Sequence, residues 1–168
     1  MIPYSRQDID QKDIDAVLEV LKSDYLTQGP KTPLFEESLC RKFLCKHAVA
    51  VNNATSALHL ACLALEVSKG DIVWTSTITF VASANCARYC GAEIDLVDID
   101  NSSYNMSISS LEEKLKIAKS KNKLPKVVIP VHLAGNPCNM ESIFKLSKEY
   151  GFKIIEDASH ACGSEYKN

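Results

Sequence analysis

The stretch Lys126-Val127-Val128-Ile129-Pro130-Val131 decides the fold class of this chain. Its β-branched residues follow one another without polar alternation, which is typical of a strand that is buried on both faces of a parallel sheet. Pro130 has no backbone N–H to donate to a neighbouring strand, so the strand should end or bend there. Parallel strands need long crossover connections, which are usually helices. Helical segments are therefore expected on both sides of this stretch.

Short apolar runs alternate with helical patterns along most of the chain. The strand-like runs are residues 48–51, 72–75, 94–97, 127–131 and 153–156. The helical patterns between them are residues 55–65, 79–89, 109–119 and 140–150. Two more helices are expected earlier, one over residues 8–22 and one with Thr32 as its N-cap and Pro33 as its first residue. This alternation predicts an α/β fold of three layers, a mainly parallel sheet with helices on both faces.

The composition is that of an ordinary globular protein. The chain has 168 residues, of which 46% are hydrophobic and 24% charged, and its formal net charge is −2. That balance gives no general attraction to nucleic acid or to acidic membranes, so neither is expected as a partner. No apolar run has the length of a membrane span, and residues 1–6 lack the apolar core of a signal peptide. The expected location is the cytoplasm.

Seven cysteines are spread along the chain without any Cys-x-x-Cys pair. Their odd number and their apolar surroundings indicate reduced, mostly buried thiols and not a disulfide framework. His132, Cys138, His160 and Cys162 are a looser group that could in principle bind a metal. Their spacings match no zinc pattern, so no metal is predicted.

The segment Ile154-Ile155-Glu156-Asp157-Ala158-Ser159-His160-Ala161 runs from an apolar strand directly into a carboxylate. A carboxylate at the end of a buried strand is costly unless a cation or hydrogen-bond donors meet it. This edge of a parallel sheet is also where ligands bind. A protonated pyridine nitrogen would suit Asp157, because pyridoxal phosphate enzymes hold that charge with an acidic residue. The alternative is that Asp157 caps a following helix.

Two other segments could contact the same ligand. Asn53-Ala54-Thr55-Ser56 joins a strand-like run to a helix, where free backbone N–H groups and hydroxyls could bind a phosphate. The alternative there is an ordinary helix cap. Phe80 follows the strand-like run 72–75 and could stack on a planar ring or simply pack in the core. His160 could donate a hydrogen bond to a cofactor oxygen or satisfy the backbone.

Taken in order, these pieces resemble the DegT-type sugar-nucleotide aminotransferases, which are pyridoxal phosphate enzymes of fold type I. The resemblance spans nearly all of the chain, in the family's order and spacing. The matching stretches are Leu26-Thr27-Gln28-Gly29, Asn53-Ala54-Thr55-Ser56-Ala57-Leu58-His59-Leu60, Thr79-Phe80-Val81-Ala82-Ser83-Ala84-Asn85, Val97-Asp98-Ile99-Asp100, Pro130-Val131-His132-Leu133-Ala134-Gly135 and Ile155-Glu156-Asp157-Ala158-Ser159-His160-Ala161-Cys162-Gly163.

The resemblance implies a binding site for pyridoxal 5'-phosphate. Thr55 and Ser56 would hold the cofactor phosphate, and Phe80 would stack on the pyridine ring. Asp157 would pair with the ring nitrogen and keep it protonated. His160 stands where many members of the family have glutamine, which contacts the phenolic oxygen of the ring. This variant is similar to the branch that aminates a 4-keto sugar nucleotide in the biosynthesis of pseudaminic acid.

The resemblance also implies how the chain is organised. Residues 1–33 would form an N-terminal helix and a substrate-side loop, in which Thr27 and Gln28 contact the substrate. Residues 34–168 would form an incomplete large domain that binds the cofactor, without the C-terminal small domain. The family's catalytic lysine, which forms a Schiff base with the cofactor, lies in a Ser-Phe-His-x-x-Lys type segment. No such segment occurs up to residue 168, so no catalytic residue is assigned within the chain.

The expected function is that of the N-terminal part of an aminotransferase. The complete enzyme would transfer an amino group, with glutamate as the donor, to a 4-keto-6-deoxy sugar nucleotide, and would work as a homodimer. Without the lysine, this chain alone is expected to be inactive. One alternative is a ligand-binding or regulatory module that kept the fold and lost the chemistry. Another is a related sugar dehydratase, in which a histidine replaces the lysine.

Overall fold

The computed structural model describes residues 6–167, and the chain divides into two compact units, Met1–Ala50 and Val51–Asn168. The expected N-terminal segment 1–33 therefore begins with residues 1–5 outside the described residues. The first unit holds helices α1 (Gln11–Leu21) and α2 (Lys31–Phe43). Among the described residues, no helix is both long and apolar enough to cross a bilayer.

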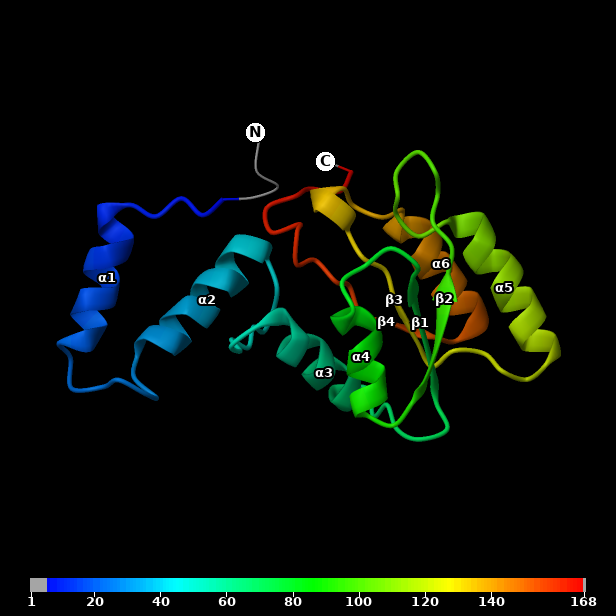
Figure 1. The fold of residues 1–168 in the computed structure, drawn as a ribbon, viewed down its shortest axis with the longest axis horizontal. Helices are drawn as coiled ribbons and strands as arrows, with labels where there is room; N and C mark the ends of the chain where they lie inside the picture. The colour runs from blue at the N-terminus through cyan, green and yellow to red at the C-terminus, as the bar shows by residue number, and fades with distance from the viewer. Residues whose placement is uncertain (1–5, 168) are drawn as a thin grey trace. The chain divides into compact units, whose positions relative to one another are not determined.

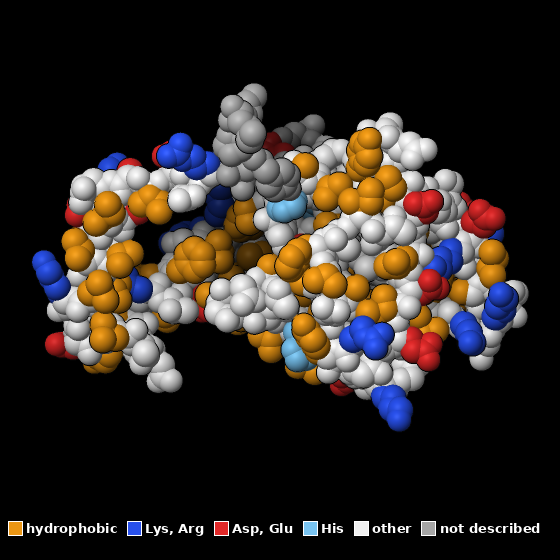
Figure 2. Space-filling model, viewed as in Figure 1, with side chains coloured by type: hydrophobic (Ala, Val, Ile, Leu, Met, Phe, Trp, Pro, Cys, Tyr) orange, Lys and Arg blue, Asp and Glu red, His pale blue; other side chains and the backbone are white. Residues whose placement is uncertain are grey.

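Helix α1 begins where its sequence favours a start. The Asp10 side chain accepts hydrogen bonds from the backbone N–H groups of Lys12 and Asp13, and the Asp13 carboxylate accepts from the Asp10 N–H. This reciprocal arrangement is a capping box. The helix buries none of its side chains, and its apolar residues gather on the surface in Figure 2. Its apolar face is thus uncovered within the first unit.

The start of α2 differs from the expectation that Thr32 is its N-cap. The helix begins at Lys31 with Pro30 in the N-cap position, so Thr32 and Pro33 lie in the first turn. The ring of Pro30 restricts φ to a helical value, here −71°, and its ψ of −15° is also helical. The chain therefore enters the helix earlier than the Thr-Pro pair suggests.

The second unit contains a parallel sheet with the strand order β2-β1-β3-β4. Its strands are β1 (Ile72–Ser76), β2 (Glu93–Val97), β3 (Val127–Ile129) and β4 (Lys153–Ile154). Its helices are α3 (Ala54–Ala64), α4 (Ala82–Tyr89), α5 (Ile108–Ser120), α6 (Met140–Tyr150) and a short 3-10 turn, η1 (Leu133–Gly135). Helices α3 and α4 cover one face of the sheet, and α5 and α6 cover the other (Figure 1). The prediction of a three-layer α/β fold with a mainly parallel sheet is confirmed.

The central strand β3 shows why its sequence is uniformly apolar. Val127, Val128 and Ile129 are all fully buried. Val127 and Ile129 pack with α3 and α4, whereas Val128 packs with α5 and α6. Each face of the strand thus contributes to a separate hydrophobic core. A polar residue at any of these positions would be buried without a partner.

The expected strand over residues 48–51 does not form. Val49 is 77% exposed, and the Ala50 N–H donates to the Glu36 side chain at 2.8 Å instead of to a neighbouring strand. A strand requires a partner for its backbone, which an apolar run by itself does not supply.

Strands β3 and β4 are shorter than expected. After Pro130 the pairing continues only as a bridge between Val131 and Asp157. Helix α4 begins at Ala82 and not at residue 79, because the segment 79–81 forms a loop after β1. Phe80 consequently lies in a loop.

The buried cysteines yield a testable prediction. Cys62, Cys86 and Cys138 are fully buried, whereas Cys45 and Cys162 are exposed. The Cys62 thiol donates to the Cys86 sulfur at 3.6 Å, and this contact, with burial, raises the pKa of Cys62 well above its usual range. We expect a thiol reagent to label Cys45 and Cys162 first. It should label Cys62, Cys86 and Cys138 more slowly, by a factor of about 100 or more. Peptide mass spectrometry of a labelling time course would measure this, and equal rates for both groups would contradict it.

Candidate functional site

The topology brings several of the predicted residues to one edge of the sheet. Helix α4 follows β1, so it begins beside the carboxyl end of that strand. Helix α3 precedes β1, and the last turn of α3 connects to the amino end of that strand. The first turn of α3 therefore lies at the opposite end, toward the carboxyl edge of the sheet. The bridge between Val131 and Asp157 lies beyond β3 and β4, on the same side. This is the edge where parallel α/β sheets bind ligands.

Asp157 is the most constrained polar group at this edge. It is only 6% exposed. Its backbone N–H donates to the Pro130 carbonyl at 2.9 Å, and its carbonyl accepts from the His132 N–H at 3.1 Å. These two bonds extend the parallel pairing past Pro130 and hold the Asp157 backbone in place. The carboxylate is thus delivered to the sheet edge by strand register.

Three donors contact the Asp157 carboxylate. The backbone N–H and the hydroxyl of Ser159 donate to Oδ1 at 3.2 and 2.6 Å. The hydroxyl of Ser83 donates to Oδ2 at 2.7 Å. The contact with the Ser159 N–H is an Asx turn, and residues 158–163 form turns without a helix. The alternative that Asp157 caps a following helix is therefore wrong.

Ser83 is a residue that the sequence did not single out. It is fully buried in the first turns of α4, and its hydroxyl also lies 2.7 Å from the hydroxyl of Thr79. Neither residue was predicted as part of the site, although both stand in the stretch that carries the family resemblance. A small hydroxyl residue early in a helix after a strand is a common pattern, so no local signal marked Ser83 as a partner of Asp157.

The first turn of α3 retains free donors. The Asn53 side chain caps the helix by accepting from the Ser56 N–H at 2.9 Å. Helix geometry leaves the N–H groups of Ala54 and Thr55 without acceptors inside the helix. The side chains of Thr55 and Ser56 are half-buried beside them. The turn is thus both a capped helix start and a potential anion site.

Phe80 and His160 lie in the loops that frame this edge. Phe80 is 72% exposed, so the alternative that it packs in the core of this chain is wrong. A large aromatic ring left in solvent beside a ligand-binding edge is available for stacking. His160 is exposed, and its Nδ1 accepts from the Ala134 backbone N–H at 3.4 Å.

His132 supports the loop after β3. It is 5% exposed, its Nε2 lies 3.1 Å from Glu156 Oε2, and its Nδ1 accepts from the Cys138 backbone N–H at 3.1 Å. Protonation would add a hydrogen to Nδ1 and break the contact with the Cys138 N–H, so the geometry favours the neutral ring. In that form Nε2–H donates to Glu156.

The other predicted residues lie elsewhere in the chain. Thr27 and Gln28 are exposed and line a cavity of about 230 Å³ within the first unit. Gln28 has a φ of 55°, in the left-handed region. Their assignment to the substrate stays a prediction. Among residues 6–167, no group of three or more His, Cys, Asp or Glu side chains is arranged to hold a metal ion.

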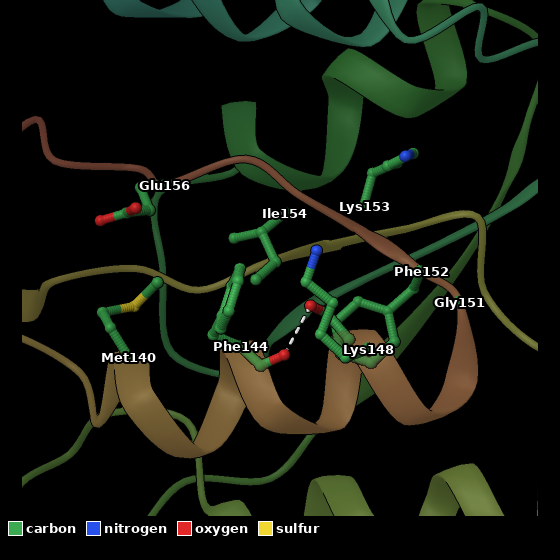
Figure 3. Close-up of a pocket in the computed structure, with 9 residues that line it drawn as sticks. Met140, Phe144, Lys148, Gly151, Phe152, Lys153, Ile154 and Glu156 are labelled. Carbon is green, nitrogen blue, oxygen red and sulfur yellow. Dashed lines mark hydrogen bonds between the residues drawn. The ribbon is translucent and has the colours of Figure 1, made fainter. Parts of the chain in front are cut away.

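The cavity of about 620 Å³ beside the edge strand β4 is separate from this site. Met140 and Phe144 of α6 and Ile154 of β4 contribute to its lining (Figure 3). It lies on the α6 side of the sheet, whereas the Asp157 carboxylate contacts Ser83 of α4, on the opposite side. The cavity contains none of the predicted cofactor residues.

Known proteins are similar to this chain over almost its whole length. The model of the "DegT/DnrJ/EryC1/StrS aminotransferase family" matches residues 7–168. A UDP-4-amino-4,6-dideoxy-N-acetyl-beta-L-altrosamine transaminase of Campylobacter jejuni is 46% identical over 167 residues, which are 99% of this chain and 43% of that protein. The chain thus spans less than half the length of that relative.

Two solved structures of aminotransferases are also similar to this chain. The Helicobacter pylori aminotransferase PseC, involved in the biosynthesis of pseudoaminic acid, superposes with a TM-score of 0.89 and 38% identity, over 99% of this chain and 43% of that one. Spr1654 of Streptococcus pneumoniae, described as a sugar aminotransferase and solved in its PLP form, superposes with a TM-score of 0.85 and 32% identity, over 96% of this chain and 44% of that one.

Proposed function

Because this chain belongs to the DegT/DnrJ/EryC1/StrS aminotransferase family, we propose that its edge of buried Asp157 and exposed Phe80 binds pyridoxal 5'-phosphate. The polypeptide would be the N-terminal part of an enzyme that transfers an amino group from glutamate to a 4-keto-6-deoxy sugar nucleotide. One observation carries the proposal. The carboxylate of Asp157 is 6% exposed at the ligand-binding edge of the sheet, and residues 6–167 leave one of its acceptor positions unfilled.

The residues at this edge fit each part of the cofactor. The free N–H groups and hydroxyls of the first α3 turn, with Thr55 and Ser56, suit the phosphate. Phe80 offers a ring face for stacking. Asp157 would accept the hydrogen of a protonated ring nitrogen, and His160, whose Nδ1 accepts from the Ala134 N–H, would contact a ring oxygen. When bound, the cofactor supplies an electron sink, which a carboxylate beside the ring nitrogen strengthens.

The remaining assignments follow from the resemblance and are part of the same proposal. Residues 34–168 would belong to the cofactor-binding large domain, and residues 1–33 would supply a helix and the substrate contacts of Thr27 and Gln28. The whole enzyme would act as a cytoplasmic homodimer. The 46% identity to the Campylobacter jejuni transaminase supports a sugar nucleotide as the substrate.

The catalytic lysine is proposed to lie beyond residue 168. Two lysines are near Asp157 in sequence, and neither is placed for this role. Lys153 is the first residue of β4, at the end of the strand away from the carboxyl edge that carries Asp157, and its side chain points away from α6 (Figure 3). Lys167 forms an ion pair with Glu141. The part of the relatives that this chain does not span leaves room for the lysine segment.

Titration of the chain with pyridoxal 5'-phosphate, followed by borohydride reduction, tests the proposal. We expect saturable binding in the absorption spectrum and no lysine adduct after reduction, as judged by intact mass and peptide mapping. A chain that binds no pyridoxal 5'-phosphate would contradict the proposed site. A stoichiometric adduct on one lysine, for example Lys153, would instead show that residues 1–168 supply their own catalytic base.

A further inference from the structure

We propose that Ser83 is a positioning residue, which orients the Asp157 carboxylate for the cofactor. The Ser83 hydroxyl fills one acceptor position of Oδ2, so the carboxylate keeps a single acceptor position, also on Oδ2, for the ring nitrogen. This inference rests on the proposed function and goes beyond it, because it assigns the oxygen that pairs with the ring and the residue that orients it. Ser83 acts through Asp157 and does not itself contact the reacting atoms.

The first step is a count of the acceptor positions on the Asp157 carboxylate. Each carboxylate oxygen has two lone pairs for hydrogen bonding. Oδ1 accepts from both the N–H and the hydroxyl of Ser159, at 3.2 and 2.6 Å, so its two positions are filled. Oδ2 accepts from the Ser83 hydroxyl at 2.7 Å, which leaves one position. A ring N–H directed at Asp157 would therefore be received by Oδ2.

The second step concerns the direction of the Ser83 proton. A serine hydroxyl has one hydrogen, and this hydrogen points at Oδ2. The contact of 2.7 Å between the Ser83 and Thr79 hydroxyls must then be a bond that Thr79 donates. With Thr79 donating to its oxygen, Ser83 keeps its own hydrogen for Oδ2. Successive bonds from Thr79 to Ser83 to Asp157 reinforce one another because each polarises the next.

The third step connects this chain of bonds to the aromatic ring. Thr79 directly precedes Phe80, and the Ser83 backbone N–H donates to the Phe80 carbonyl at 3.1 Å. The loop that presents Phe80 is therefore joined to Asp157 through Ser83 by both backbone and side-chain bonds. Ser83 sets the position of the carboxylate relative to the ring that would stack on the cofactor.

The test compares variants of the chain in their binding of pyridoxal 5'-phosphate. Ser83→Ala removes the donor, Ser83→Thr keeps it, and Thr79→Val removes only the second hydroxyl. Ser147→Ala is the matched control, since Ser147 is also a buried helical serine but lies on α6, on the other face of the sheet, and donates to the Phe144 carbonyl. Affinity is measured by equilibrium titration. The protonation of the cofactor's ring is read by ¹⁵N NMR with ring-labelled pyridoxal 5'-phosphate, across a pH series.

Ser83→Ala should lower the affinity by about 10-fold, as expected for the loss of a hydrogen bond to a charged group. It should also shift the deprotonation of the bound ring nitrogen to lower pH. Ser83→Thr should restore both properties, Thr79→Val should give a smaller loss, and Ser147→Ala should leave both unchanged. Thermal melting of each variant separates these effects from misfolding.

Two outcomes would overturn the proposal, and they are distinguishable. If the wild-type chain binds and Ser83→Ala binds equally well with the same ring-nitrogen titration, Asp157 is positioned without Ser83 and only this inference fails. If the wild-type chain does not bind pyridoxal 5'-phosphate, the proposed function fails and the role of Ser83 fails with it.

Discussion

Replacing Asp157 with asparagine is expected to weaken the binding of pyridoxal 5'-phosphate by about 10- to 100-fold, because a hydrogen bond to a charged partner contributes about 1.5–3 kcal/mol. The amide of asparagine has one acceptor oxygen and an NH₂ group that only donates. In place of the Asp157 carboxylate, the NH₂ group would face either Ser159 or Ser83, whose hydroxyls both donate to Asp157. The variant thus loses the charge and also disturbs the donors that hold it.

Glu156→Gln is the matched control for this experiment. It removes the same charge from the adjacent residue, but Glu156 is exposed and pairs with His132. We expect its affinity for pyridoxal 5'-phosphate to stay within about twofold of wild type, because changes to exposed groups are usually small. Titrations of both variants, with circular dichroism to confirm folding, measure the difference. Equal affinities for Asp157→Asn and wild type would rule out pairing with the ring nitrogen.

Replacing Leu115 with alanine is expected to lower the free energy of unfolding by about 2–5 kcal/mol. Leu115 is fully buried between α5 and the sheet, in the core that also contains Val128 and Ile143. The substitution removes apolar contacts and leaves a cavity that the neighbouring side chains fill only partly. Since a protein's net stability is only about 5–15 kcal/mol, this loss is a large fraction of the total.

Ile117→Ala provides the comparison on the same helix. Ile117 is 49% exposed on α5, so its truncation should cost less than about 1 kcal/mol. Urea unfolding followed by circular dichroism gives both values under one set of conditions. If Leu115→Ala proves as stable as Ile117→Ala or more stable, the core that contains Leu115, Val128 and Ile143 contributes less to stability than its burial indicates.

Local patterns in the sequence predicted much of the fold. The β-branched run of β3 indicated burial on both faces, and Val127 and Val128 do pack into different cores. The pattern over residues 140–150 predicted α6 with the bounds that it has. The prediction of a strand over residues 48–51 was wrong. A strand depends on a neighbouring strand, and four apolar residues do not show whether one lies beside them.

The candidate site was predictable only in part. The carboxylate after an apolar strand pointed to Asp157, and the Asn53 to Ser56 segment pointed to a helix start, because both signals lie within a few residues of sequence. Ser83 was missed. Its bond to Asp157 joins residues 74 positions apart, and that contact depends on how α4 packs against the sheet.

The sequence by itself determined the fold class and the presence of a carboxylate after an apolar strand, since these follow from residue types and their spacing. It also indicated the family, through the resemblance of its motifs to those of known members. Only the tertiary structure decided that Phe80 is exposed, that Ser159 fills Oδ1, and that Ser83 leaves one acceptor on Oδ2. The physical reason is that a hydroxyl donates along one direction. Which acceptor it meets is set by strand register and helix packing, and these come from the whole core and not from any one segment.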